Sequence, residues 1–184
     1  MSLPVLFTED LLLRSFVPDD AGDVARLCND PALCDGTLSL PYPYPVSLAR
    51  NWIASQRENR DLELAYEFAV TDRISGALYG CISLSNHAAH GNGEIGYWIG
   101  KDFWGRGIAT QAGKALLHWA FAEKGFHRIY GRHFSSNPAS GRVLQKLGMT
   151  YEGTQREHLL RNGTYRDVLL YGILASEEKP PETA

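Results

Sequence analysis

The sequence is poor in cysteine, and its cysteines form no recognisable pattern. There are three, Cys28, Cys34 and Cys81, an odd number without a Cys-x-x-Cys pair. Neither a disulfide framework nor a zinc ribbon is therefore indicated. The six histidines are scattered, with no cysteine or carboxylate at the spacing of metal ligands, so we expect no metal site. A reducing, cytoplasmic setting fits this composition.

An excess of one charge is also missing, as is any long apolar run. Lysine and arginine number 18 and aspartate and glutamate 21, for a formal net charge of −3. A surface this close to neutral attracts nucleic acid weakly. No segment approaches the roughly 18 apolar residues that a membrane span needs, and residues 1–10 lack the order of a secretory signal. We therefore expect no nucleic-acid partner and no membrane association.

The length and composition indicate one globular domain. The chain has 184 residues, of which 44% are hydrophobic and 21% charged, and it shows no internal repeat or low-complexity block. We expect a single domain over residues 1–175. Residues 176–184 are polar and contain proline, which predicts a flexible C-terminal tail.

Apolar periodicity and turn signals predict alternating strands and helices. Strands are expected over 11–16, 66–71, 79–85, 94–99, 128–134, 149–156 and 167–174. Helices are expected over 18–28, from an N-cap at Ser47 to about 60, over 108–124 and over 138–147. Asn162-Gly163 predicts a hairpin turn. This order is typical of an α+β domain with a mixed sheet and one βαβ crossover, rather than of a doubly wound Rossmann fold.

A glycine-rich turn carries the clearest chemical signal. Trp104-Gly105-Arg106-Gly107-Ile108-Ala109-Thr110 follows a predicted strand and opens a predicted helix. A helix N-terminus has free N–H groups and the positive end of the helix dipole, and glycine lets a phosphate approach the backbone. The spacing matches neither a P-loop nor a dinucleotide fingerprint. The turn therefore predicts a phosphate or pyrophosphate site, unless the glycines serve turn geometry alone.

This turn resembles the acetyl-CoA pyrophosphate loop of the GNAT superfamily of N-acetyltransferases. Asn137-Pro138-Ala139-Ser140, followed by Leu147-Gly148-Met149, is similar to the second acetyl-CoA segment of that family. The segment from Glu152-Gly153 to Tyr171 resembles one branch, the ribosomal-protein N-terminal acetyltransferases of the RimJ/RimL type. The resemblance covers about residues 8–174.

The resemblance implies a GNAT-like fold, in which the sheet is splayed between strands 94–99 and 128–134, and acetyl-CoA as cosubstrate. The pantetheine arm would pair with the main chain of Tyr97, Trp98 and Ile99 and contact Asn137. The pyrophosphate would be bound by the turn, through Trp104, Gly105, Arg106, Gly107, Ile108, Ala109 and Thr110. The family often has glutamine or arginine three residues before the first glycine, where this chain has Asp102.

Acyl transfer needs a neutral amine, a stabilised oxyanion and a protonated leaving thiolate. The resemblance implies that a main-chain N–H near Ile99 stabilises the oxyanion. Glu94, on the strand leading to the thioester, is the first candidate for the base, although it would equally fit a surface carboxylate; Asp167 and Glu157 are rivals. Many family members have a tyrosine that acts as the acid; at the corresponding position this chain has Leu144. The resemblance to the RimJ/RimL branch therefore makes Ser140 the candidate acid, unless it is ordinary helix-start polarity.

The acceptor amine is constrained by acid–base arithmetic. An α-amine with a pKa of about 7.7–8.0 is roughly one-third neutral at pH 7.5, whereas a lysine is neutral only about 0.1% of the time. A site with one candidate carboxylate suits an α-amine better than a lysine, which favours protein N-termini or small amines. We expect the α-amine of a protein N-terminus as the acceptor. A small-molecule amine acetyltransferase and a non-catalytic acyl-CoA sensor remain open. Tyr42 and Tyr44, in a proline-rich loop, are candidate walls of the acceptor site unless they close the core. A monomer and a homodimer are equally compatible.

Overall fold

The computed structural model describes residues 3–178. Its strands are β1 (Leu6–Phe7), β2 (Leu11–Arg14), β3 (Ala65–Asp72), β4 (Leu78–His87), β5 (Asn92–Ile99), β6 (Arg128–Phe134), β7 (Thr150–Arg161) and β8 (Thr164–Leu174). Its α-helices are α1 (Ala21–Cys28), α2 (Pro31–Gly36), α3 (Val46–Asp61), α4 (Ile108–Ala122) and α5 (Pro138–Lys146). Short 3-10 helices lie at Pro18–Asp20, Ala88–His90, Lys101–Phe103 and Ala175–Glu177.

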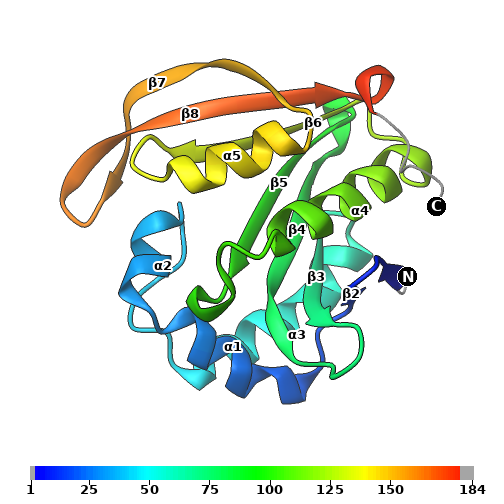
Figure 1. Cartoon of the computed structure of the whole chain (residues 1–184), viewed down its shortest axis with the longest axis vertical. Helices are drawn as coiled ribbons and strands as arrows, with labels where there is room; N and C mark the ends of the chain where they lie inside the picture. Colours follow the sequence, from blue (N-terminus) through cyan, green and yellow to red (C-terminus); the bar gives the residue numbers. More distant parts are fainter. Residues whose placement is uncertain (1–2, 179–184) are drawn as a thin grey trace.

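The strands form one mixed sheet in the order β1-β2-β3-β4-β5-β6-β8-β7. Every neighbouring pair is antiparallel except β5 and β6, which are parallel and are joined by α4 as a crossover (Figure 1). Parallel neighbours require such a crossover, because a tight turn can only reverse the chain. The predicted α+β class, the mixed sheet and the single βαβ unit are confirmed.

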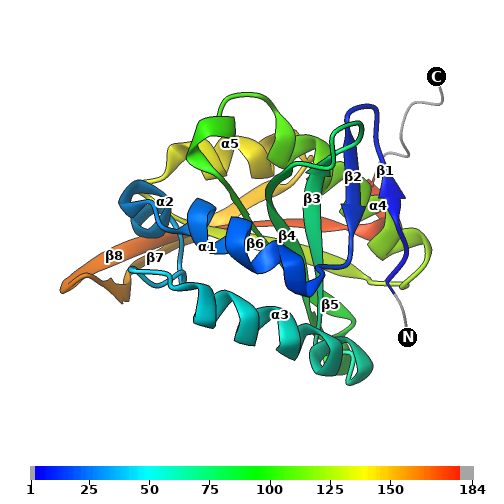
Figure 2. The same cartoon turned by 90° about the horizontal axis from the view of Figure 1, so that it is seen from below.

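Helices cover both faces of the sheet (Figure 2). On one face α4 and α5 pack over a core that includes Phe68, Ile82 and Leu116. On the other face α1 and α3 bury a second cluster. The apolar face of α1, formed by Ala21, Val24, Ala25 and Cys28, is buried in that second cluster. The alternation of side chains along each central strand supplies both cores.

The sheet opens into a fork between β5 and β6. Their pairing runs from Asn92↔Arg128 to Ile95↔Gly131 and then stops, although β5 continues to Ile99. A Cβ on Gly131 would lie 2.7 Å from a methyl group of Leu144 on α5 and 3.0 Å from Ile95. Glycine at this position therefore lets α5 pack tightly against the base of the fork. The splayed sheet expected from the family resemblance is confirmed.

Some elements differ from the sequence-based prediction. The short strand β1 and the helix α2 were not predicted, although Asp30 caps α2 by accepting hydrogen bonds from the amides of Ala32 and Leu33. The N-cap prediction for Ser47 is wrong. Pro45 is the cap residue of α3, and its carbonyl accepts hydrogen bonds from the next turn, so Ser47 lies inside the helix.

The last hairpin is longer than predicted. β7 extends to Arg161. The sequence did not reveal this length because two register irregularities, at Tyr151/Gly153 and Gln155/Leu159, interrupt the alternation of side chains that marks a strand. The predicted Asn162-Gly163 turn is present, with positive φ at both residues. Residues 176–178 of the expected tail lie in or beside the last 3-10 helix. There the carboxylate of Glu178 lies 3.2 Å from Nδ1 of His118. Residues 179–184 lie outside the described residues.

Leu116 tests the packing of α4 on the sheet. Its side chain is fully buried, so Leu116→Ala should lower the free energy of unfolding by about 3 kcal/mol through lost transfer energy and a residual cavity. Denaturant unfolding of the two proteins measures this. Lys114→Ala on the exposed side of the same helix is the control, and equal losses in both variants would contradict the packing described here.

Candidate active site

A cavity of about 1170 Å³ lies at the fork of the sheet and extends to both of its faces. On the α4–α5 face it is lined by the glycine-rich turn and the start of α5. On the α1–α3 face it is lined by side chains of β3, β4 and β5 and by the loop before α3. We call these the turn half and the loop half of the cavity. The predicted residues that line it are Glu94, Tyr97, Trp98, Ile99, Trp104, Gly105, Gly107, Ile108, Ala109, Thr110, Asn137, Ser140 and Tyr44; Arg106 and Tyr42 do not.

The glycine-rich turn has the backbone that its sequence requires. Gly105 and Gly107 both have a φ of 77°, a left-handed conformation that favours glycine. No atom lies within 4 Å of the position that a Cβ would take at either residue. Turn geometry therefore explains the glycines, and the same two positions leave open space over the start of α4.

The amide groups of this turn have no acceptor inside the described part of the protein. Within residues 3–178, the N–H groups of residues 105–110 donate to no backbone or side-chain oxygen, and the first amide of α4 to do so is that of Gln111, which donates to Gly107. The turn is held from behind, since Nε1 of Trp104 donates to the carbonyl of Ile99 at 2.6 Å. This arrangement can bind an anion by main-chain hydrogen bonds at the positive end of the helix dipole.

Beyond Ile95, β5 has no partner on its β6 side. The main-chain groups of Tyr97, Trp98 and Ile99 that point away from β4 therefore have no neighbouring strand, although the carbonyl of Ile99 already accepts from Nε1 of Trp104. Asn137 stands across the gap as the N-cap of α5. Its Oδ1 accepts from the amide of Ser140 at 3.2 Å, and its Nδ2 donates to the carbonyl of Gly36 at 2.9 Å.

Two hydroxyl groups meet in the turn half of the cavity. Oη of Tyr97 and Oγ of Ser140 are 2.8 Å apart, and Oη also donates to the Ser140 carbonyl at 3.0 Å. Burial raises the pKa of Tyr97 to about 12, so its hydroxyl remains protonated at neutral pH. Ser140 is thus linked to a second proton-bearing group, which the sequence did not indicate.

Glu94 is tied to a cation. Its two carboxylate oxygens accept from Nε and Nη2 of Arg132 on β6, at 2.8 and 2.9 Å, and Oη of Tyr130 donates to it at 3.3 Å. The side chains of Glu94 and Arg132 are 18% and 28% exposed. This bidentate pair joins β5 to β6 at the base of the fork. A carboxylate in such a pair loses that ion pair when it takes up a proton.

The rival carboxylates do not line the cavity. Oδ1 of Asp167 accepts from the main-chain amide of Glu157 at 2.8 Å, which fixes the irregular part of the β7–β8 hairpin. Neither residue is among those that line the cavity. The carboxylates that do line it, within residues 3–178, are Glu94 and Glu67.

The two predicted wall tyrosines have different positions. Tyr44 is 5% exposed, packs in the second core cluster and lines the loop half of the cavity. Burial raises its pKa to about 12. Tyr42 is 56% exposed and does not line the cavity. Tyr44 therefore closes the second core cluster and also lines the loop half of the cavity.

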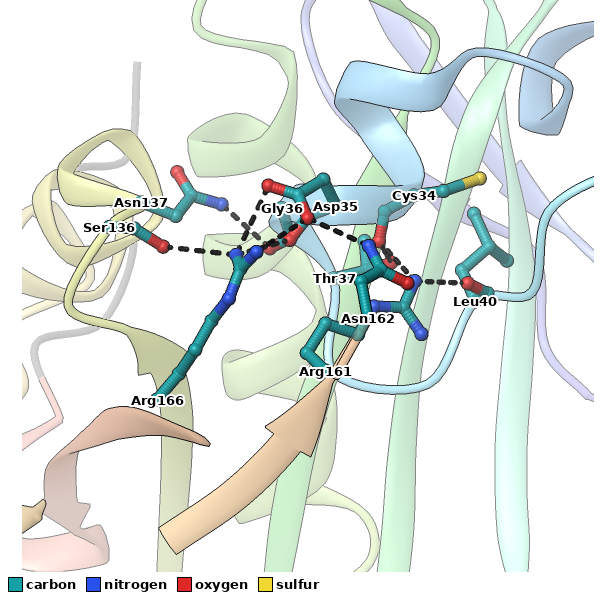
Figure 3. Close-up of polar contacts among 10 residues, drawn as sticks. All are labelled: Cys34, Asp35, Gly36, Thr37, Leu40, Ser136, Asn137, Arg161, Asn162 and Arg166. Atoms are coloured by element: carbon teal, nitrogen blue, oxygen red, sulfur yellow. Dashed lines mark hydrogen bonds and ion pairs between the residues drawn. The ribbon is translucent and has the colours of Figure 1, made fainter. Parts of the chain in front are cut away.

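The wall of the loop half is fastened to the last hairpin (Figure 3). Arg166 of β8 pairs with Asp35 of α2 at 2.8 Å, and Arg161 donates to the carbonyls of Cys34 and Leu40. The hydrogen bonds from Arg166 lower the pKa of Asp35 below its ordinary value. Asn162 adds a hydrogen bond to Asp35 at 3.1 Å. These contacts join α2 and the loop that follows it to the β7–β8 hairpin.

Several lining residues were not found from the sequence. Arg142 and Lys146 on α5 bring positive charge to the turn half. Arg132 was not recognised, although an arginine in the middle of a predicted strand is a signal of a buried partner. Glu67 was missed too, and a single carboxylate inside the apolar strand 66–71 is the corresponding signal.

Within residues 3–178, no helix is long and apolar enough to cross a membrane. In the same part of the chain, no group of three or more His, Cys, Asp and Glu side chains is placed to hold a metal ion.

Comparison with known proteins matches this geometry to a family. The sequence model described as "Acetyltransferase (GNAT) domain" matches residues 10–150. The uncharacterized N-acetyltransferase p20 of Bacillus licheniformis is 30% identical over 183 residues, covering 95% of this chain and 98% of p20. The [Ribosomal protein uS5]-alanine N-acetyltransferase of Escherichia coli is 28% identical over 122 residues, covering 63% of this chain and 61% of that protein.

A solved structure agrees with these relatives. RimJ of Mycobacterium smegmatis in complex with CoA-disulfide superposes with a TM-score of 0.82 at 25% identity, covering 94% of this chain and 85% of RimJ. The chain belongs to the GNAT acetyltransferase family. It is an acetyl-CoA-dependent N-acetyltransferase whose relatives include ribosomal-protein N-acetyltransferases of the RimJ/RimL type, and the resemblance noted from the sequence is confirmed.

Gly107 tests the role of the turn. Gly107→Glu should weaken acetyl-CoA binding more than about 100-fold, because the new carboxylate stands where the coenzyme phosphates would lie and like charges repel. Isothermal titration calorimetry with acetyl-CoA measures this.

The control for this variant separates charge from backbone strain. Gly163 has the same φ of 77° with open space around it, but lies in the hairpin turn outside the cavity. Gly163→Glu should keep the affinity of the parent protein. Unchanged affinity in Gly107→Glu would remove the turn from the binding site.

Proposed function

We propose that this protein transfers the acetyl group of acetyl-CoA to the α-amine of a protein N-terminus. The observation that carries the proposal is the row of unpartnered amides at residues 105–110, which opens into the same cavity as the free edge of β5. An anion-binding turn next to an unpaired strand edge suits a long ligand with phosphates at one end and an acyl thioester at the other.

The proposed binding mode follows the turn half of the cavity. The amides of residues 105–110 receive the pyrophosphate, with Arg142 and Lys146 of α5 adding positive charge nearby. The unpaired main chain of Tyr97, Trp98 and Ile99 receives the pantetheine arm. The side chain of Asn137 already makes two protein hydrogen bonds, so we assign its contribution first to holding the start of α5 in place.

Chemistry would take place where β5 leaves β6. The amine nitrogen attacks the thioester carbon and the carbon–sulfur bond breaks; the nitrogen then loses one proton and the departing sulfur gains one. We assign the proton donated to the sulfur to the hydroxyl of Ser140, which Tyr97 orients at 2.8 Å and which regains a proton from the one that the nitrogen releases. An N–H of the free β5 edge near Ile99 would stabilise the oxyanion. Glu94 stays a candidate base, although its pair with Arg132 supports a second role in fixing the base of the fork.

An α-amine acceptor is supported by two observations. Its pKa is about two units below that of lysine, so much less free energy is needed to deprotonate it. The Escherichia coli relative is named for the alanine of a ribosomal protein, which suggests an N-terminal alanine as a first acceptor to try.

The acceptor can be identified with a peptide panel. Short peptides with a free N-terminal alanine or serine, the same peptides blocked at the N-terminus but carrying a lysine, and spermidine are each incubated with acetyl-CoA while released thiol is followed. We expect turnover with the free N-terminal peptides alone. Turnover confined to spermidine would instead favour a small-amine enzyme, and acetyl-CoA binding without turnover on any amine would contradict the proposal.

Ser140 tests the proposed acid. Ser140→Ala should lower kcat by about 100-fold or more, since general acid catalysis contributes about 100- to 10,000-fold, with little change in the affinity for acetyl-CoA. Steady-state rates and calorimetry measure the two quantities separately. Ser135→Ala, at an exposed position just before the same helix and outside the cavity lining, is the control. Equal kcat in Ser140→Ala and the parent protein would return Ser140 to a structural role.

A further inference from the structure

Glu67 is a buried carboxylate that the proposed chemistry has not used. It lies in the middle of β3 and is 8% exposed. Its neighbours Tyr66 and Phe68 point into the core beneath α4, whereas Glu67 points to the opposite face and lines the loop half of the cavity. A charged side chain at such a position costs free energy unless something else compensates it.

The protein itself compensates this charge only in part. Oε1 of Glu67 accepts one hydrogen bond, from Nδ2 of Asn59 on α3, at 3.1 Å. Within residues 3–178, no lysine, arginine or histidine nitrogen lies within 4.0 Å of its carboxylate. Glu94, in the same cavity, has both oxygens bound by Arg132. The two carboxylates therefore face the cavity in different electrostatic states.

The surroundings of Glu67 favour a group that can exchange a proton. Burial raises the pKa of Glu67 above its ordinary value, while the hydrogen bond from Asn59 and the positive charge of Arg60 on α3 act in the opposite direction. The nearest titratable group on β4 is Cys81, a buried thiol whose pKa is raised well above its ordinary value. Arg132 is neutralised by Glu94 across the cavity.

The register of the sheet places Glu67 in line with the fork. Glu67 pairs with Ser83 of β4, and Ser83 pairs with Gly96 of β5, the first residue beyond the last β5–β6 pair. Two strand spacings, about 10 Å between the outer Cα atoms, separate the ends of this row. Ser83 and Gly96 are small, so the path from the carboxylate to the fork is not blocked by their side chains.

We propose that Glu67 is the acceptor-binding carboxylate: it holds the acceptor amine as an ammonium ion in the loop half of the cavity and takes its proton before attack at the fork. This assignment rests on the proposed acetyl transfer to an amine. In the step, R–NH3⁺ and the Glu67 carboxylate become R–NH2 and a neutral carboxylic acid, with no change in total charge. The free amine then attacks the thioester, and Glu67 returns its proton to water when product leaves.

The assignment predicts a preference for cationic acceptors. A buried, unpaired carboxylate gains most from a partner that brings a positive charge and hydrogen-bond donors together. A primary ammonium supplies both. A neutral or acidic group at the same place would leave the carboxylate uncompensated, so Glu67 would also select against such acceptors.

The test is the pH dependence of Glu67→Gln with the free N-terminal alanine peptide. At pH 6.5 the α-amine is almost entirely protonated, and we expect kcat/KM to fall about 100-fold relative to the parent protein. At pH 9.5 the amine is neutral without help, and we expect the two proteins to differ less than about threefold. A buried glutamine that only disturbed packing would lower the rate by the same factor at every pH.

Controls make the result specific. Glu58→Gln removes the same charge from an exposed position on α3, one residue before Asn59, and should follow the parent profile. Acetyl-CoA affinity, measured by calorimetry, should be unchanged in Glu67→Gln. A pH-independent loss, or no loss, would overturn the role of Glu67 while transfer by the parent protein still supported the proposed function; no transfer by the parent protein to any amine would overturn both.

Discussion

The structure depends on a pairing that stops early. β5 and β6 share four residue pairs and then separate, and α5 packs against the glycine at the last of these pairs. An open strand edge in the middle of a sheet would ordinarily be costly, since its amides and carbonyls lose partners. Here it forms the floor of the cavity, and the free amides of the adjoining turn continue the same row of donors.

The two carboxylates that line the cavity, Glu94 and Glu67, have different surroundings and therefore suit different roles. Glu94 has an arginine partner, and this ion pair joins β5 to β6 at the base of the fork. Glu67 is buried and accepts one side-chain hydrogen bond, from Asn59, and in our proposal the acceptor amine compensates its charge. A pair of titratable groups whose environments differ in this way is a recurrent sign of divided roles in catalysis.

Much of the fold was predictable from local signals. The helix beginning at Pro138 has Asn137 as cap, and Gly148, with a positive φ, directly follows its C-cap residue Leu147. The glycine-rich turn was located because its residues are contiguous. Glu67 and Arg132 could not be identified in the same way, because their positions in the cavity depend on sheet register and on partners from other elements. Ser47 failed as a cap because the preceding Pro45 already starts the helix, and α2 is too short to show a period.

Asn137 gives the molecule a mechanical property. One amide group ties the first turn of α5, on the turn half, to the end of α2, on the loop half. A shift of either helix therefore has to be followed by the other, or a hydrogen bond worth about 1 kcal/mol is lost. Asn137 thus couples the half of the cavity where we propose that the coenzyme binds to the half where we propose that the amine enters, so a displacement of one helix on binding would be felt at the other.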